Sequence, residues 1–196
     1  MSPSTYGAPT RTYRLPKTDT PDPADSVDIE GPDVSGDQML WAVYNDANST
    51  LHKNAAGSST PLGVEIRQTT FAFNRQGALG NTLFLKFQFI NRGADTLSNM
   101  FVSLWSDPDL GGFTDDLVGC DTTLSLGYCY NATNTDNLYG SAPPAVGFDF
   151  FQGPIGDDGN ELPMTSFNKY INGTDPDSPA KAYFYQQGLA ADGAQV

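Results

Sequence analysis

Gly63-Val-Glu-Ile-Arg-Gln-Thr-Thr-Phe-Ala-Phe-Asn74 and, one short turn later, Thr82-Leu-Phe-Leu-Lys-Phe-Gln-Phe-Ile90 are the stretches that decide the fold. In both, large apolar residues recur at every second position, which is typical of β-strands that bury one face. The alternation changes phase within the first stretch, which predicts a β-bulge near Gln68-Thr69. Because the connection is short, the two strands are predicted to be antiparallel neighbours.

The same pattern extends in both directions along the chain. Residues 38–44 alternate large side chains and read as a strand, and residues 97–105 are predicted to form the third strand of an antiparallel meander. Shorter strands are expected at 117–118, 124–130 and 143–151, and a single helix at 178–188. The chain is therefore predicted to be all-β, an antiparallel β-sandwich of the Ig-like or jelly-roll-like kind, with long acidic loops and little helix. A single sheet with one face covered by the C-terminal tail is the alternative.

Composition sets the domain organisation and excludes some partners. The 196 residues fit one domain, or one domain plus an arm. Residues 1–36 hold six prolines and are predicted to be an extended Pro/Asp-rich arm or linker, and residues 37–196 are predicted to be the β-sandwich module. The net charge of −13 argues against a nucleic-acid partner, because phosphate binding needs clustered lysine and arginine. No apolar run approaches the roughly 20 residues of a membrane helix, so membrane insertion is not expected.

An acidic stretch directly follows the predicted strand 97–105. Between Ser106 and Asp121 it contains no lysine or arginine, so its carboxylates would repel one another unless a cation lies between them. Calcium suits a flexible loop of oxygen ligands, although the spacing is not that of an EF-hand. The alternative is a solvated acidic turn whose side chains cap backbone N–H groups. The predicted ligands are the five aspartates of this stretch: Asp107, Asp109, Asp115, Asp116 and Asp121. Three residues after the second cysteine could complete the cage if the chain folds back: Asn131, Asn134 and Asp136.

The two cysteines, Cys120 and Cys129, lie nine positions apart across a glycine-containing turn. Two cysteines alone do not make a structural zinc site, and the only histidine, His52, is remote in sequence. A local disulfide between them is the first expectation, and two free buried thiols are the alternative.

Nothing in the sequence indicates an enzyme. His52 lies in a polar loop with no nucleophile motif around it, and no pair of carboxylates stands out as a glycosidase acid and base. Exposed aromatic rings could instead form a sugar-stacking platform, although most of them fall on predicted strands and would then be core residues. These rings are Trp41, Trp105, Tyr44, Tyr128, Tyr130 and Tyr139.

Several long segments resemble a module found in large secreted surface proteins of bacteria that use the type IX secretion route. The resemblance covers the chain from Asp37 to about Asp192, and its first matching piece is Gly36-Asp-Gln-Met-Leu-Trp-Ala-Val-Tyr-Asn-Asp46. Further matches are Ser106-Asp-Pro-Asp-Leu-Gly111, Asp115-Asp-Leu-Val-Gly-Cys-Asp-Thr-Thr-Leu-Ser-Leu-Gly-Tyr-Cys-Tyr-Asn131, Tyr139-Gly-Ser-Ala-Pro-Pro-Ala-Val-Gly-Phe-Asp-Phe-Phe-Gln-Gly153 and Met164-Thr-Ser-Phe-Asn-Lys-Tyr-Ile-Asn172. The resemblance implies export and an extracellular or cell-surface location, and no characterised activity. Its usual members are much longer, so the chain is expected to be an excerpt, truncated at the C-terminus.

Taken together, these patterns predict a non-enzymatic, extracellular structural or adhesive module that is stabilised by calcium. Its expected partners are other domains of a parent protein or identical subunits, and an arm that lies on a neighbouring copy would build a fibre or filament. A glycan-binding module of a surface protein is the alternative.

Overall fold

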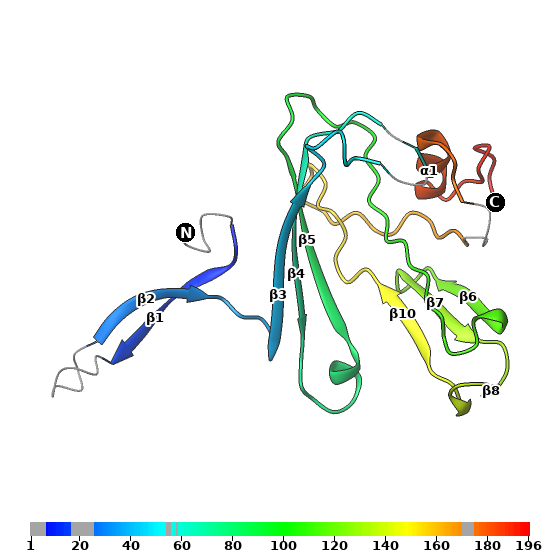
Figure 1. Cartoon of the computed structure of the whole chain (residues 1–196), viewed down its shortest axis with the longest axis horizontal. Helices are drawn as coiled ribbons and strands as arrows, with labels where there is room; N and C mark the ends of the chain where they lie inside the picture. The colour runs from blue at the N-terminus through cyan, green and yellow to red at the C-terminus, as the bar shows by residue number, and fades with distance from the viewer. Residues whose placement is uncertain (1–6, 17–25, 54–55, 58, 170–174) are drawn as a thin grey trace. The chain divides into compact units, whose positions relative to one another are not determined.

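A computed structural model describes residues 7–16, 26–53, 56–57, 59–169 and 175–196 (Figure 1). The chain divides into two compact units. Unit 1 comprises residues 1–52 and 60–98, and unit 2 comprises residues 53–59 and 99–196. Residues 1–36, the predicted arm, fall in unit 1 with the first long strands, and residues 37–196 contribute to both units.

Unit 1 contains a three-stranded antiparallel sheet with strand order β3-β4-β5. Its strands are β3 (Gln38–Asn45), β4 (Val64–Ala72) and β5 (Leu83–Asn91), and the 3-10 turn η2 (Ala78–Asn81) lies between the last two. The register places Phe71 opposite Phe84, and their rings stack with centroids 5.1 Å apart. Phe73 meets both rings edge-on, so three aromatic residues fix one end of the sheet.

The predicted bulge at Gln68 and Thr69 is absent. Both residues continue the ladder on each side, Gln68 opposite Ala42 and Phe87, and Thr69 opposite Trp41 and Lys86. The alternation changes phase in the sequence because this central strand carries large side chains on both of its faces, and not because of an extra residue.

One face of the sheet is largely apolar, with exposed leucine and phenylalanine side chains at Leu40, Leu83, Leu85, Phe87 and Phe89.

The predicted strand over residues 97–105 is wrong, since no strand is assigned there. Asn99 has a φ of 53°, a left-handed conformation that an extended strand does not accommodate. Its carbonyl oxygen instead accepts a hydrogen bond from the Tyr183 hydroxyl at 2.7 Å, and Phe101 packs edge-on against the same tyrosine ring. The third strand of the sheet is β3, which precedes β4 in the chain.

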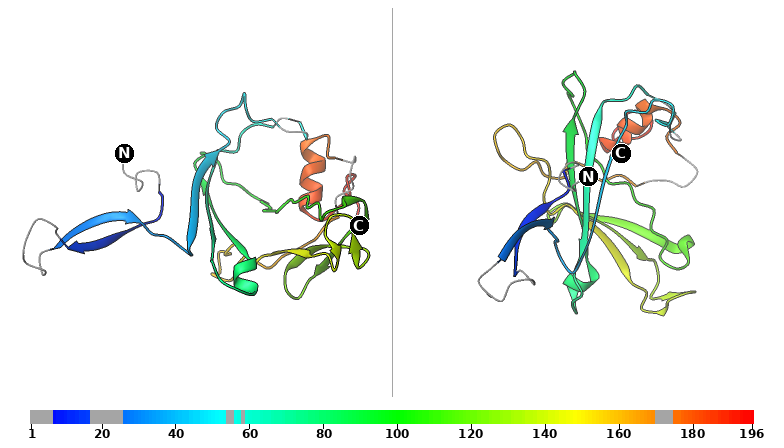
Figure 2. Two further views of the ribbon diagram at one scale, coloured as in Figure 1. Left: turned by 60° about the horizontal axis from the view of Figure 1, so that its bottom comes forward. Right: turned by 60° about the vertical axis from the view of Figure 1, so that its left-hand side comes forward.

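The described part of the predicted arm is a β-hairpin, β1 (Thr10–Pro16) and β2 (Ser26–Pro32), rather than a single extended segment. Figure 2 shows the two strands pairing with each other, as a sheet separate from β3-β4-β5. The register places two cross-strand apolar pairs on one face of the hairpin: Tyr13 with Ile29 and Leu15 with Val27. The opposite face is polar and is joined by side-chain hydrogen bonds, from Thr10 to Glu30 at 2.6 Å and from Arg14 to Ser26 at 2.7 Å. The hairpin is thus amphipathic.

One carboxylate fastens the long connection between β3 and β4. Asp46 accepts backbone N–H groups of three consecutive residues, from Leu62 at 2.5 Å, from Gly63 at 3.1 Å and from Val64 at 2.9 Å. Gly63 has a φ of 77° and lies against the backbone of Gly93, a position where a Cβ would clash. The entry into β4 is therefore set by one side chain and one glycine.

Unit 2 contains a second antiparallel sheet, with strand order β10-β7-β6. Its strands are β6 (Asp116–Asp121), β7 (Leu126–Asn131) and β10 (Ala145–Asp149), and a short hairpin joins β8 (Thr135–Asp136) to β9 (Gly140–Ser141). The 3-10 turn η3 (Phe113–Asp115) leads into β6. Among the described residues, the buried apolar side chains all lie in this unit: Ala56, Leu110 and Cys129.

The predicted helix is confirmed as α1 (Pro179–Gln186). Ser178 caps it by accepting the N–H of Lys181 at 3.4 Å, Pro179 occupies the first helical position, and Gly188 follows with a φ of 74°. The predicted class is confirmed as well: antiparallel strands and one short helix make an all-β, sandwich-like fold without a closed barrel. Within the described ranges, no helix is long and apolar enough to cross a membrane.

Candidate functional site

The five aspartates of the acidic stretch do not lie together. Asp107 and Asp109 are exposed in the segment before η3, whereas Asp115 ends η3 and Asp116 begins β6. Asp121 is at the opposite end of β6, where it accepts the hydroxyl and backbone N–H of Thr123 at 2.6 Å and 2.9 Å. Over the residues that the structure describes, no group of three or more carboxylate, histidine or cysteine side chains is arranged to hold a metal ion.

Asp116 instead lies opposite an asparagine across the sheet. Asp116 on β6 is the cross-strand partner of Asn131 on β7, so both side chains emerge from the same face. Asn131 is 8% exposed, and its Nδ2 donates to Asp115 Oδ2 at 3.2 Å and to the carbonyl oxygens of Thr133 and Thr135 at 2.9 Å and 3.1 Å. The backbone N–H of Leu110 donates to Asp116 Oδ2 at 2.9 Å. The remaining oxygens, Asp116 Oδ1 and Asn131 Oδ1, are buried and have no hydrogen-bond partner among the residues that the structure describes.

A further carboxylate closes the loop beside this pair. Asp136 accepts the backbone N–H of Gly112 at 2.8 Å, and its other oxygen accepts those of Leu138 and Tyr139 at 2.8 Å and 2.7 Å. The N–H groups of Tyr139 and Gly112 hold the pKa of Asp136 below its usual value. Gly111, with a φ of 77°, has no room for a Cβ beside the Asp136 carboxylate, so a glycine is required at this turn.

The charge around this cluster is one-sided. The sequence contains no lysine or arginine between Arg92 and Lys169, although eleven aspartates and glutamates fall in that interval. Neutralisation of the cluster by a basic side chain from a neighbouring position in the chain is therefore impossible. Backbone N–H groups offset part of the negative charge, as those of Leu110 and Gly112 do at Asp116 and Asp136.

The predicted disulfide is wrong, because both cysteines are free thiols. Cys120 is opposite Gly127 and Cys129 is opposite Val118, so the two sulfurs are diagonal neighbours on one face of the sheet. Diagonal positions are about 7–8 Å apart, beyond the usual Cα separation of a disulfide. Burial raises the pKa of Cys129, and the negative charge of Asp116 adds to the effect.

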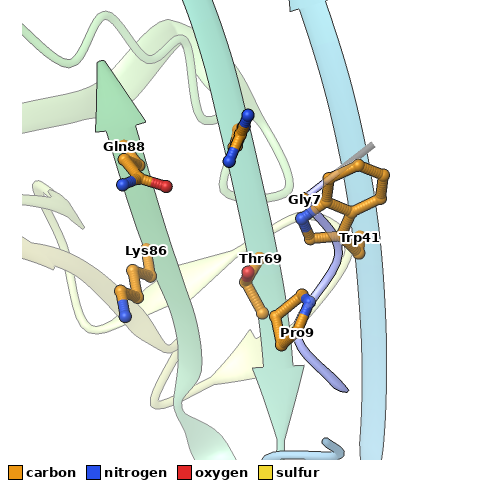
Figure 3. A pocket seen from close by; sticks show the side chains of 7 residues that line it. Gly7, Pro9, Trp41, Thr69, Lys86 and Gln88 are labelled. Atoms are coloured by element: carbon orange, nitrogen blue, oxygen red, sulfur yellow. The ribbon is translucent and has the colours of Figure 1, made fainter. Parts of the chain in front are cut away.

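A small hollow in unit 1 is a second candidate, with a volume of about 70 Å³ (Figure 3). Trp41, Thr69 and Lys86 come from adjacent strands at matched register, and the arm contributes Gly7 and Pro9. Ligand pockets usually enclose several hundred Å³. The hollow is therefore too small to hold a sugar ring or a cofactor.

The predicted aromatic platform is divided between the units, since Trp41 and Tyr44 lie on β3 of unit 1. In unit 2, Tyr128 and Tyr130 are neighbours on β7, with ring centroids 5.8 Å apart. Tyr139 is 54% exposed and follows the Asp136 turn. Trp105 is also exposed, so part of the aromatic set is at the surface rather than in a core.

Comparison of the chain with known protein families, with curated proteins and with solved structures found no match. The candidate site therefore depends on its own geometry. Sequence reasoning found Asp115 and Asp116 and considered Asn131 and Asp136 as additions, and the structure brings these four residues to neighbouring positions. It does not bring Asp121 there, because the length of β6 separates the two ends of the strand.

Proposed function

We propose that the chain is a non-enzymatic, extracellular structural module, stabilised by calcium, that associates with identical copies of itself. The observation that carries this proposal is the hairpin β1-β2, which pairs with no other strand in the described part of the chain. An isolated two-stranded hairpin is at best marginally stable in water. A covering partner would account for its ordered, amphipathic face.

The apolar face of the hairpin is the docking surface in this proposal. Leu15, Val27 and Ile29 on this face are all exposed, next to the partly exposed ring of Tyr13. The complementary surface is the apolar face of the β3-β4-β5 sheet, which carries exposed Leu85. The four apolar side chains of the hairpin face present roughly 400 Å² of surface, about half of the area that each partner buries in an interface of standard size. Association through a single hairpin is therefore weak and depends on protein concentration.

Docking of a hairpin on the sheet of the next copy is a head-to-tail contact. Such contacts join different surfaces of two copies and extend into an open filament unless a rotation closes them into a ring. Repeated weak contacts hold a surface layer together through multivalency, without tight binding at any one of them.

The test uses two variants that block different halves of the contact. In sedimentation velocity across a hundredfold concentration range, the wild type should assemble, while Ile29→Lys and Leu85→Lys should each remain monomeric. An equimolar mixture of the two variants should form a 1:1 heterodimer and stop there, because it contains one intact hairpin and one intact sheet face. Thr12→Lys, on the polar face of the hairpin, is the matched control and should assemble like the wild type.

Two results would reject the proposal. A wild type that stays monomeric at every concentration would show that copies do not associate. Assembly that survives Ile29→Lys would show that the hairpin face is not the contact.

Glycan binding is the second candidate, and the observation that favours it is the exposure of two aromatic rings near the acidic turn. Phe113 is 62% exposed. The Asp136 carboxylate accepts the N–H groups of Gly112, which precedes Phe113, and of Tyr139, so it brings the two aromatic residues near each other. Sugar rings stack on exposed aromatic side chains of this kind. Binding to a glycan array that is lost in Phe113→Ala and Tyr139→Ala, and kept in Leu138→Ala, would support this function over self-assembly.

A further inference from the structure

Two buried acceptor oxygens on the face of the β10-β7-β6 sheet have no donor in the described part of the chain. They are Asp116 Oδ1 and Asn131 Oδ1. Both belong to cross-strand partners, so they project from the same face at the same level of the sheet. Buried acceptors are normally satisfied by protein, water or an ion, and two in one place indicate a bound species that supplies positive charge or donors.

The orientation of the Asn131 amide is determined by its neighbours. Its Nδ2 is surrounded by acceptors, the Asp115 carboxylate and the carbonyl oxygens of Thr133 and Thr135. Exchange of oxygen and nitrogen would place Oδ1 against these three oxygens and is excluded. The amide oxygen therefore points away from them, and it does so in a side chain that is more than nine-tenths buried.

Asp116 is held in a similar way. Its Oδ2 accepts the N–H of Leu110, a buried residue, at 2.9 Å, which leaves Oδ1 as the free oxygen. With no basic residue in the sequence from 93 to 168, the carboxylate has no cationic side chain nearby along the chain. A bound cation meets both requirements at once, since it neutralises Asp116 and satisfies the amide oxygen.

We infer that one calcium ion binds between Asp116 Oδ1 and Asn131 Oδ1, with water in the rest of its coordination shell. Carboxylate and amide oxygens are typical calcium ligands, whereas magnesium requires a near-ideal octahedron and the transition metals other than manganese favour nitrogen or sulfur. This inference refines the calcium binding named in the proposed function. It moves the site from the exposed Asp107 and Asp109 to the sheet, and it does not depend on self-assembly.

The experiment is a thermal melt of the full-length chain in calcium and in EDTA, followed through Trp105 in a Trp41→Phe background. Trp105 is the tryptophan of unit 2, where the site lies. At a hundredfold excess of calcium over its dissociation constant, the melting temperature should rise by roughly 5–10 °C. Calorimetric titration with calcium should give a stoichiometry of one ion per chain, and magnesium at the same concentration should give a smaller shift.

The decisive variant is Asp116→Asn. Its side-chain N–H group can donate to Asn131 Oδ1 in place of the ion, so the protein should still fold in EDTA and should lose the calcium shift. Asp107→Asn removes the same charge from the exposed segment and should keep the shift. Ile29→Lys should also keep it, which separates a failure of this site from a failure of assembly.

The inference is overturned by any of three results. The absence of both a shift and a binding isotherm in the wild type would mean that water alone fills the site. A shift that persists in Asp116→Asn would place the ion elsewhere. A shift that disappears in Asp107→Asn would return the site to the exposed loop.

Discussion

Replacement of Asp46 by alanine should be among the more destabilising single changes in unit 1. The carboxylate accepts three backbone N–H groups at the start of β4. Leu62 is exposed, so its N–H can turn to water, but those of Gly63 and Val64 are partly buried. Each partly buried N–H left without an acceptor costs about 1–1.5 kcal/mol, so Asp46→Ala should lower the free energy of unfolding by about 2–3 kcal/mol.

The assay is urea unfolding followed by fluorescence in a Trp105→Phe background, which leaves Trp41 on β3 as the reporter of unit 1. With an m-value near the low end for small domains, the midpoint should fall by about 2 M at an unchanged slope. Asp46→Asn retains an acceptor oxygen and should lose about 1 kcal/mol. Asp95→Ala, which removes the same charge from an exposed position of unit 1, is the control.

A loss of less than about 0.5 kcal/mol in Asp46→Ala, equal to that of Asp95→Ala, would refute this reasoning, because surface substitutions alone have effects of that size. The entry into β4 would then be set by strand pairing and not by the carboxylate.

Three further outcomes are expected. Backbone N–H groups lower the pKa of Asp136, so the stability that its carboxylate contributes is present above about pH 4 and is lost as the pH falls through the pKa of the folded state. Asp136→Asn should therefore have a lower melting temperature than the wild type at pH 7, and this difference in melting temperature should vanish in acid. Native alkylation at pH 8 should modify Cys120 well before Cys129, which is 3% exposed and has a raised pKa; equal rates by mass spectrometry would contradict the burial. Ser178→Ala should cost about 1 kcal/mol through loss of the helix cap, and Ser178→Asp should restore it, both measured by thermal melting.

The sequence predicted correctly those elements whose formation depends on residues close together in the chain. Period-two alternation found β4 and β5 within two residues of their ends, and the cap, proline and glycine signals found α1. Alternation failed over residues 97–105, because the conformation of Asn99 and its bond to Tyr183 depend on a partner 84 positions away. The hairpin was missed for a different reason, since a proline-containing segment separates its two strands in the sequence and each strand carries only two apolar residues of the shared face.

The candidate site shows a similar limit. Carboxylate density pointed to the region of the candidate site and to two of its residues, Asp115 and Asp116, but density alone could not rank five aspartates by environment. The deciding property is burial of an oxygen without a donor, which arises from the pairing of β6 with β7. Asparagine is uncharged, so carboxylate density does not point to it, and the sequence predicted Asn131 only as an additional ligand.

The absence of basic residues between Arg92 and Lys169 also determines how the protein responds to proteases. Trypsin cleaves after lysine and arginine, so it has no site anywhere in the β10-β7-β6 sheet, folded or unfolded. Tryptic digestion should therefore release this region as one long peptide that covers residues 93–169. Limited proteolysis and peptide mapping of unit 2 require chymotrypsin or an aspartate-directed protease, and survival of this fragment in trypsin says nothing about its stability.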